Sequence, residues 1–359
     1  MKKKICFFNS VKSWGGGEKW HLEMALYLKD KGYQVVLYCQ KNGALHKKAE
    51  NSGLELRLID IENLSFLNPF KIYKLVQLFK KDTPDILILN ASKDIKTGAV
   101  AAKLAEIEKI VYRRGSAIPI KNTSLNRFYF KKVLTHMLAN SQETKRTVNQ
   151  NNATLFPKEK IEVIYNGIHL ENYHPIKNKS KGETFVIGNL GRLEYQKNQT
   201  ALLDMAVMLK SKNLNFKLII GGEGRLLNSL KNKAKELDVE DVVVFQGYVE
   251  DVNTFMSQLD VFVLTSHWEG FGYVIAEASY HYKPVLAFNV SSNPEIIDNN
   301  VTGFLIEKDN LVDLVDKILL LNSNEEMSLD MGVKGHDFVN QHFDAEINNK
   351  KVETYLESI

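Results

Sequence analysis

The order of apolar strands and amphipathic helices along the 359 residues is the feature that most restricts the fold. Short apolar runs at 4–8, 34–39 and 84–89 alternate with segments of helical periodicity such as 69–81. Strands that alternate with helices are typical of βαβ units and a parallel sheet. The same alternation starts again after a polar stretch without periodicity at 169–182. The sequence therefore predicts an α/β protein with two Rossmann-like domains.

We expect four parts in the chain. Residues 1–168 form an N-terminal domain, 169–182 a linker, and 183–340 a C-terminal domain. The tail is expected to be helical from residue 322, and its last segment, 341–359, is predicted to cross back to the first domain. Two such domains with a ligand cleft between them would place binding residues at the carboxyl ends of the strands.

The stretch 264–278 places two carboxylates beside glycines. An apolar strand ends at Leu264, a loop with Glu269 follows, and Glu277 lies one turn into the next helix. A strand, a glycine-rich turn and a helix start make a site for an anion such as a phosphate. Carboxylates suit hydroxyl groups instead, because a hydroxyl donates a hydrogen bond to the charge. A nucleotide sugar carries both a diphosphate and hydroxyls. The alternative is a pair of solvated surface acids.

The spacing of these two acids resembles the Glu-x7-Glu signature of the retaining glycosyltransferases of the GT-B fold, family 4. The resemblance extends over the whole chain. It implies two facing Rossmann-like domains with a cleft between them. It also implies that Glu277 holds the nucleotide ribose and that Glu269 contacts the donor sugar. Gly270, Phe271 and Gly272 would complete this donor-binding loop.

Two cations follow the first predicted strand of the second domain. Arg192 comes directly after Gly191, and Lys197 stands five residues further on. An arginine fork and a lysine point charge at a strand end suit a diphosphate. In the family, these positions neutralise the donor diphosphate and the leaving group, so the resemblance implies catalytic roles for Arg192, Lys197 and Glu269. With these cations present, we expect that no metal ion and no cofactor are required.

Further glycine-containing segments match the family. The residues Gly15, Gly16, Gly17 and Glu18 resemble its Gly-Gly-x-Glu loop, which implies that the backbone at Gly16 and Gly17 approaches the donor phosphate. The spacing is not that of a dinucleotide fingerprint. Tyr248 and Val249 match a segment that lines the base pocket in the family, which implies that they bind the donor.

Two adjacent arginines depart from the family pattern. Many members carry a His-Gly pair after the fifth strand, whereas this chain has Arg113, Arg114 and Gly115 there. As a hypothesis, Arg114, with Arg113, recognises an anionic group on the acceptor or the donor. The alternative is a pair of surface arginines.

The charge is divided unequally between the two halves. Residues 1–168 contain 29 Lys and Arg against 15 Asp and Glu, while residues 169–359 contain 18 against 28. Such asymmetry suggests that the first half meets a polyanion, for which a lipid-linked carrier, a charged glycan or an anionic inner-membrane surface would each serve. A generally lysine-rich surface explains it equally well. Nucleic acid is disfavoured because no nucleic-acid motif accompanies the charge. The segment 125–134, which mixes aromatic and basic residues, fits an interfacial helix or a buried helix with a basic edge.

The chain begins with three lysines, and the apolar run that follows them ends at Asn9, which is too short for a signal peptide. The sequence contains only two cysteines, which fits a reducing compartment. We therefore expect a cytoplasmic protein, peripheral on the inner face of the plasma membrane if it binds membranes at all. The predicted function is sugar transfer from a UDP- or GDP-sugar to a hydroxyl of a glycan or lipid-linked acceptor, in polysaccharide or lipopolysaccharide synthesis. Two alternatives stay open: a GT-B nucleotide-sugar epimerase and a non-catalytic nucleotide-sugar-binding protein.

Overall fold

A computed structural model describes residues 2–176 and 182–359, which form two compact α/β units. The first unit ends at Asn166 and regains Glu346–Ile359 at the end of the chain. The second unit is Gly167–Ala345. The described part of the predicted linker, 169–176, therefore belongs to the second unit and includes a short 3-10 turn at Leu170–Asn172. Residues 177–181 of that linker lie outside the described residues.

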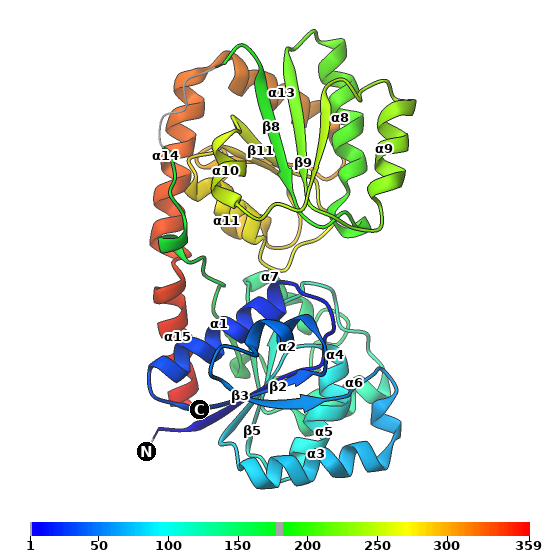
Figure 1. Cartoon of the computed structure of the whole chain (residues 1–359), viewed down its shortest axis with the longest axis vertical. Helices are drawn as coiled ribbons and strands as arrows, with labels where there is room; N and C mark the ends of the chain where they lie inside the picture. Colours follow the sequence, from blue (N-terminus) through cyan, green and yellow to red (C-terminus); the bar gives the residue numbers. More distant parts are fainter. Residues whose placement is uncertain (1, 177–181) are drawn as a thin grey trace. The chain divides into compact units, whose positions relative to one another are not determined.

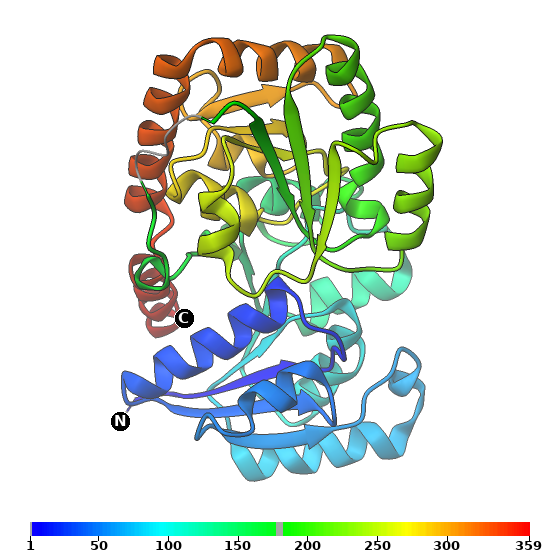
Figure 2. The same cartoon turned by 45° about the horizontal axis from the view of Figure 1, so that its top comes forward.

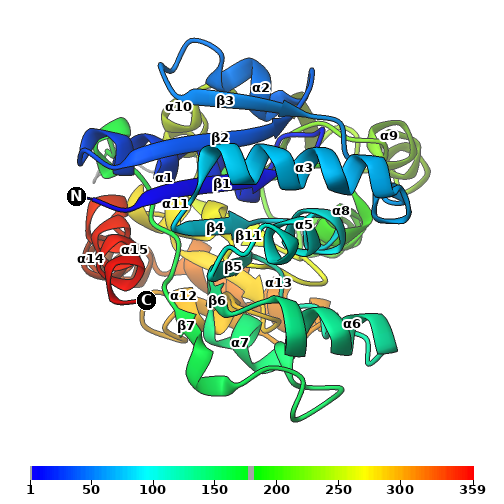
Figure 3. The same cartoon turned by 90° about the horizontal axis from the view of Figure 1, so that it is seen from below.

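The first unit is built on a parallel sheet of seven strands in the order β3-β2-β1-β4-β5-β6-β7 (Figure 3). The strands are β1 (Lys4–Asn9), β2 (Gln34–Gln40), β3 (Glu55–Ile59), β4 (Ile86–Leu89), β5 (Lys109–Arg114), β6 (His136–Ala139) and β7 (Ile161–Val163). Its α-helices are α1 (Gly16–Asp30), α2 (Ala44–Ala49), α3 (Pro69–Asp82), α4 (Ser92–Asp94), α5 (Val100–Leu104), α6 (Ser124–Phe128), α7 (Gln142–Val148) and α15 (Ala345–Ser358).

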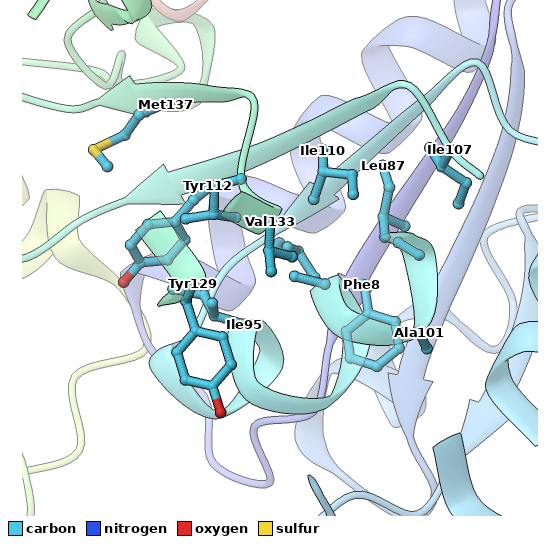
Figure 4. Packing of buried hydrophobic residues seen from close by; sticks show 14 of the residues in the cluster. Phe8, Leu87, Ile95, Ala101, Ile107, Ile110, Tyr112, Tyr129, Val133 and Met137 are labelled. Carbon is cyan, nitrogen blue, oxygen red and sulfur yellow. The ribbon is translucent and has the colours of Figure 1, made fainter. Parts of the chain in front are cut away.

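Alternate side chains of the central strands in the first unit enter two different cores. From β1, Cys6 and Phe8 pack on one face, and Ile5 and Phe7 on the other. Figure 2 shows α1 and α3 on opposite sides of these strands. Figure 4 shows the α3 and α5 side, where Phe8 and residues of β4 and β5 meet helical side chains such as Ile95. Because a strand has period two, coverage of both faces makes these strands continuously apolar in sequence.

The final helix, α15, packs on the first unit. Val352 and Leu356 are buried in the core on the α1 side of the sheet. Glu353 is also buried, and it accepts hydrogen bonds from Tyr27 and Tyr33. The pKa of Tyr27 is raised to about 12 by burial and by the neighbouring Glu353. The helix thus contributes both apolar contacts and a buried polar network to the unit.

The second unit has a parallel sheet of six strands in the order β10-β9-β8-β11-β12-β13. The strands are β8 (Phe185–Leu190), β9 (Phe216–Gly221), β10 (Val243–Gly247), β11 (Val261–Leu264), β12 (Val285–Phe288) and β13 (Gly303–Ile306). Its helices are α8 (Gln199–Ser211), α9 (Leu227–Glu236), α10 (Val252–Ser257), α11 (Tyr273–Tyr280), α12 (Asn293–Ile296), α13 (Leu311–Ser323) and α14 (Glu325–His342). Figure 1 shows α8 and α9 on one side of β8 and β9.

Most predicted elements are present, and the differences lie where local signals are weak. The prediction placed the helical tail from residue 322, but α13 begins at Leu311, where Asn310 caps the helix by accepting a hydrogen bond from Asp313 N. Strand β13 was not predicted because it is only four residues long and begins with Gly303. That glycine is needed because a Cβ there would meet the Val285 carbonyl oxygen of β12 at 2.3 Å.

Candidate functional site

The candidate site lies at the carboxyl edge of the second sheet, where the strand order reverses between β8 and β11. From β8 the chain continues outward to β9 and β10, and from β11 it continues in the opposite direction to β12 and β13. The loops after two adjacent parallel strands diverge at such a point, which leaves room for a ligand. Arg192 and Lys197 follow β8, and Glu269 follows β11.

Lys197 and Glu269 form an ion pair at this edge. Lys197 Nζ lies 2.6 Å from Glu269 Oε1, and Ser266 Oγ donates to the same oxygen at 2.6 Å. Glu269 is only 5% exposed, so it is not a solvated surface acid. Its other oxygen, Oε2, accepts no hydrogen bond within residues 2–176 and 182–359. One carboxylate can thus hold the lysine and still offer an acceptor to a ligand hydroxyl.

Three hydrogen bonds between two loops fix Lys197 opposite Glu269. Gln196 Nε2 donates to the Trp268 carbonyl at 2.9 Å, and the His267 N–H donates to the Gln196 carbonyl at 2.8 Å. Thr265 Oγ1 donates to the carbonyl of Asn198 at 3.0 Å. The geometry of the ion pair therefore depends on the hydrogen bonds that join the segment 196–198 to the segment 265–268.

Glu277 is held by a tyrosine from a distant part of the chain. It lies on α11, is 8% exposed, and accepts a hydrogen bond from Tyr173 OH at 2.9 Å. The ring of Tyr173 packs edge-on against His281, with centroids 5.2 Å apart. His281 Nδ1 lies 2.7 Å from the Glu277 carbonyl, and burial lowers the pKa of this histidine. Tyr173 and His281 together set the position of the Glu277 carboxylate.

Arg192 is exposed, and no side chain in the described ranges pairs with its guanidinium. Its backbone is fixed, because its carbonyl accepts from Gln199 Nε2 at 3.1 Å. The strand-end loops pack closely here. A Cβ on Gly222 would meet the Gly191 carbonyl oxygen at 2.0 Å, and the backbone φ of Gly222 is +121°. Only glycine fits this position. Arg192 therefore places an exposed cation on a closely packed stretch of backbone.

The loop before α11 combines a buried aromatic ring with a left-handed glycine. Phe271 is buried against Phe343, with ring centroids 5.3 Å apart, whereas the neighbouring Gly270 is half-buried. Gly272 has φ +75° and stands at the helix N-cap, where the described structure shows no side-chain cap. Phe271 thus anchors the loop, and the start of α11 is left to interact with a ligand.

Tyr248 and Val249 follow β10 at the same edge of the sheet and differ in exposure. Tyr248 is 73% exposed. Val249 is half-buried beside Gly221, where a Cβ on the glycine would meet the valine methyl at 2.7 Å. Tyr248 is therefore open to a ligand, and Val249 packs against Gly221 at the end of β9.

Two family models match the chain in succession. Residues 14–172 match the model described as Glycosyltransferase Family 4, and residues 171–337 match Glycosyl transferases group 1. The chain is a family 4 glycosyltransferase. The predicted enzyme class and the GT-B class, with two Rossmann-like units, are confirmed.

Several relatives align with this glycosyltransferase over most of their length. The chain is 25% identical to an Escherichia coli UDP-Gal:alpha-D-GlcNAc-diphosphoundecaprenol alpha-1,3-galactosyltransferase, with 91% of this chain and 90% of the relative covered. It is 27% identical to a Staphylococcus aureus capsular polysaccharide biosynthesis glycosyltransferase, CapM, with 89% and 91% covered. Among solved structures, Anabaena Alr3699/HepE in complex with UDP and glucose superposes with a TM-score of 0.86 at 22% identity, covering 99% of this chain and 100% of that one.

In the first unit of the glycosyltransferase, Gly16 and Gly17 are the first two residues of α1, which follows β1 at the strand-order reversal between β1 and β4. Glu18 is buried, and its Oε1 accepts from Asn9 Nδ2 at 3.2 Å and Asn90 Nδ2 at 3.0 Å. A Cβ on Gly17 would meet the Asn90 amide at 2.6 Å. Glu18 thus holds Asn90 against Gly17 in the first turn of α1, whereas Gly16 is exposed.

The two arginines of β5 point to opposite faces of the sheet, as consecutive strand residues must. Arg113 is 3% exposed, donates to Asn166 Oδ1 at 2.8 Å, and lies over the Trp20 ring. Arg114 is 7% exposed and donates to the Ile118 carbonyl, while its buried Nε has no partner in the described chain. The alternative of a surface pair is therefore wrong. An anion-binding role remains a prediction, and Arg114 is the better placed of the two.

Two further observations concern metal ions and membranes. Among the residues with assigned positions, no group of three or more His, Cys, Asp and Glu side chains could hold a metal ion. No helix in the same ranges is long and apolar enough to cross a bilayer.

Sequence reasoning missed four residues that the structure brings into these networks: Asn9, Asn90, Tyr173 and Ser266. Asn9 ends β1 and Asn90 directly follows β4, so a polar residue at the end of an apolar strand was the available signal. Ser266 follows β11 and offered the same signal. Tyr173 offered none, because its partner is 104 residues away.

Proposed function

We propose that this glycosyltransferase is a retaining enzyme that moves a sugar from a nucleoside-diphosphate sugar to a hydroxyl of a glycan or lipid-linked acceptor in cell-surface polysaccharide synthesis. The observation that carries the proposal is the Lys197–Glu269 ion pair, with Arg192 and Glu277 at the same sheet edge. Cations suit a diphosphate, and carboxylates with an unused oxygen suit the hydroxyls of a sugar and a ribose.

In this proposal each residue acts on a stated part of the donor. Arg192 and Lys197 neutralise the diphosphate, and the charge they stabilise grows as the leaving group departs. Glu269 accepts from the sugar hydroxyls, and Glu277 accepts from the ribose. Gly16 and Gly17 approach the phosphate, and Tyr248 contacts the base.

The transfer itself is proposed to occur on one face of the sugar. The bond from the anomeric carbon to the diphosphate oxygen breaks, and a bond to the acceptor oxygen forms on the same face. The acceptor proton passes to the departing phosphate oxygen, so charges and atoms balance. No side chain is needed as a nucleophile, and we propose that no metal ion is required because the two cations supply the positive field.

The relatives guide the choice of donor and acceptor. The Escherichia coli relative is named for a UDP-sugar donor and a diphosphate-linked lipid acceptor, and the Staphylococcus aureus relative for capsular polysaccharide synthesis. We therefore propose a UDP-sugar first and a GDP-sugar second as the donor. If the acceptor is lipid-linked, the enzyme would work at the inner face of the plasma membrane.

A thermal-shift screen with UDP, GDP, ADP, CMP and NAD⁺ tests this proposal. A ligand present at about 100 times its Kd should raise the free energy of unfolding by about 2.7 kcal/mol. We expect one nucleoside diphosphate to stabilise the wild type and Glu277→Ala to reduce that effect. Glu250→Ala, which removes an exposed acid after β10, is the matched control.

Incubation with the identified donor then separates the enzyme classes. Transfer to an acceptor with the anomeric configuration kept would support the proposal. Inversion would overturn the retaining mechanism. An epimerised sugar formed without an acceptor would assign the epimerase activity instead. In the thermal-shift screen, stabilisation by NAD⁺ alone would overturn the proposed donor site.

A further inference from the structure

The first unit contains an open pocket lined by lysines that the proposed donor site does not use. It has a volume of about 570 Å³. Its cationic residues are Lys12, Lys71 and Lys93, and the rest of its lining is Ile61, Glu62, Asn63, Leu64, Ser65 and Asn68. We refer to it as the lysine pocket.

The three lysines come from three separate segments that follow strands at one edge of the sheet. Lys12 follows β1, Lys71 lies in the first turn of α3 after β3, and Lys93 lies on α4 after β4. All three therefore stand beyond the carboxyl ends of parallel strands, where α/β sheets bind their ligands. Lys93 is half-buried and donates to the Ser10 carbonyl at 2.6 Å, which fixes its direction.

Two acids in the neighbourhood partly balance the lysines. Lys12 Nζ lies 3.3 Å from Glu62, and Lys71 Nζ lies 3.2 Å from Asp60. The side chains of Glu62 and Asp60 are 66% and 70% exposed. Exposed pairs of this kind contribute little to stability, so a ligand can replace them. A diphosphate carries more charge than either carboxylate, and it can engage several lysines at once.

A row of exposed apolar side chains begins at the rim of the pocket. Leu64, which lines the pocket, is 69% exposed, and Leu67, Phe70 and Tyr73 are 67%, 82% and 64% exposed. Phe70 and Tyr73 lie on the same face of α3 because they are three residues apart. We call these four residues the apolar stripe. Large apolar side chains that are exposed together usually mark a binding surface.

We propose that the lysine pocket binds the phosphate or diphosphate group of an amphiphilic acceptor, and that the acceptor's apolar chain lies along the apolar stripe. The inference rests on the proposed function, because it names the acceptor class of the same transferase. The inference depends on the position of the lysine pocket next to the apolar stripe. The cationic pocket suits the phosphate head of an amphiphile, and the stripe, which begins at the rim of the pocket, suits the apolar tail.

Direct binding of farnesyl diphosphate to the full chain tests the inference without any need for catalysis. We expect binding by calorimetry, with inorganic pyrophosphate weaker and farnesol weaker still. The double variant Lys12→Ala/Lys71→Ala should raise the Kd of farnesyl diphosphate about tenfold or more. Lys74→Ala is the matched control, since it removes an exposed lysine of the same helix that does not line the pocket, and it should change the Kd by less than about twofold.

The apolar stripe is tested separately. Leu67→Ser/Phe70→Ser should raise the Kd of farnesyl diphosphate but leave that of pyrophosphate unchanged. Phe128→Ser, at a residue that is 49% exposed on α6, should change neither. These side chains are on the surface, so the variants should keep the wild-type circular dichroism spectrum.

Several results would overturn the inference. Equal losses in Lys74→Ala and the double variant would show diffuse charge rather than a pocket. Farnesol binding as tightly as farnesyl diphosphate would remove the role of the phosphate. Displacement of the ligand by phosphatidylglycerol vesicles would assign the surface to lipid headgroups instead. UDP binding, measured on the same preparations, separates the two proposals. UDP binding without farnesyl diphosphate binding would overturn only the acceptor pocket. Farnesyl diphosphate binding without UDP binding would overturn only the donor site.

Discussion

The two points of strand-order reversal differ in their charges, although both units follow the same Rossmann-like plan. In the second unit the edge between β8 and β11 carries Arg192 and the Lys197–Glu269 pair. In the first unit the edge between β1 and β4 carries two buried acids, Glu18 and Asp94, whose hydrogen bonds come from neutral donors. The half of the chain with excess acid therefore has two cations at its reversal point, and the half with excess base buries two acids at its own, with Lys12 and Lys93 in the segments around them.

This contrast separates the net charge of a domain from the charge of its site. Net charge is a sum over many exposed side chains, and it governs solubility and long-range attraction. The charge of a site depends on the few residues that follow the strands. The acids in the first unit are bound into its structure, which predicts that they affect stability, whereas the second unit's charges should affect catalysis.

The largest expected effect is that of Lys197→Ala, which should lower kcat with the identified donor by about 10²–10³, or about 3–4 kcal/mol. The leaving diphosphate would lose a cation, and Glu269 would lose its partner. Steady-state kinetics measure this. Lys210→Ala, which removes an exposed lysine paired with Asp238 and Asp241, should leave kcat unchanged. A kcat for Lys197→Ala within about threefold of the wild type would remove the catalytic contrast between the units.

The second expected effect is a pH dependence of stability that arises from Asp94. Burial raises the pKa of Asp94 to about 6, against hydrogen bonds from Ser10 and Ala91 that lower it. The unfolded chain releases this proton near its ordinary value of 3.8. Between those values the folded state binds more protons, so the contribution of Asp94 to stability is present below pH 3.8 and is lost as the pH rises through about 6. The loss should total about 3 kcal/mol.

Urea unfolding of the wild type and of Asp94→Asn across pH 4–8 measures the contribution of Asp94 to the free energy of unfolding. The difference in free energy of unfolding between the two proteins should shift against the wild type by about 2–2.5 kcal/mol from pH 4 to pH 8, because part of the total is already lost at pH 4. Other carboxyls give the stability the opposite pH dependence. An example is Asp82, whose pKa is lowered, despite its burial, by hydrogen bonds from Arg57 and Tyr38. Their effect is the same in both proteins, so it cancels in the difference. A difference that is constant with pH would show that Asp94 is charged throughout.

A smaller loss of stability is expected for Gly17→Ala, because the new methyl group would meet the Asn90 amide at 2.6 Å. The asparagine must move away from Glu18, and we expect a destabilisation of about 1–3 kcal/mol by urea unfolding. Gly32→Ala in the same unit meets no atom within 4 Å, although its φ of +85° strains alanine. A loss for Gly17→Ala no greater than for Gly32→Ala would mean that the Glu18–Asn90 contact is not rigid.

The smallest expected effect belongs to Tyr173→Phe, which removes the hydrogen bond to Glu277. We expect the Kd of the bound nucleotide to rise by about five- to tenfold, corresponding to about 1 kcal/mol, with little change in kcat. Tyr280→Phe is the control, because its ring contacts Tyr173 with centroids 6.0 Å apart. If Tyr173→Phe lowered kcat and left the nucleotide Kd unchanged, Glu277 would act on the reaction rather than on the ribose.

Local periodicity was enough to predict most of the fold. The strands 4–8 and 84–89 are recognisable because both faces of a covered sheet need apolar residues, which makes the run continuous. Helix α3 differs from the predicted range 69–81 by one residue. In the structure Asn68 caps its start and Pro69 is its first residue, and both are local signals of a helix start. By contrast, α7 has only seven residues and a mostly polar sequence, so its periodicity is too short to detect.

The sequence by itself determined the alternation of strands and helices, and with it two parallel sheets. In the second unit it also determined that Arg192, Lys197 and Glu269 follow strands and that Glu277 lies on the helix after them. That information is local, because it depends on the spacing of apolar residues and on which residue follows a strand. Only the tertiary structure decided that Lys197 pairs with Glu269, that Tyr173 holds Glu277, and that three lysines from separate segments of the chain line one pocket. These contacts join residues from about 20 to more than 100 positions apart, and no local pattern records a distance that the folding of the chain creates.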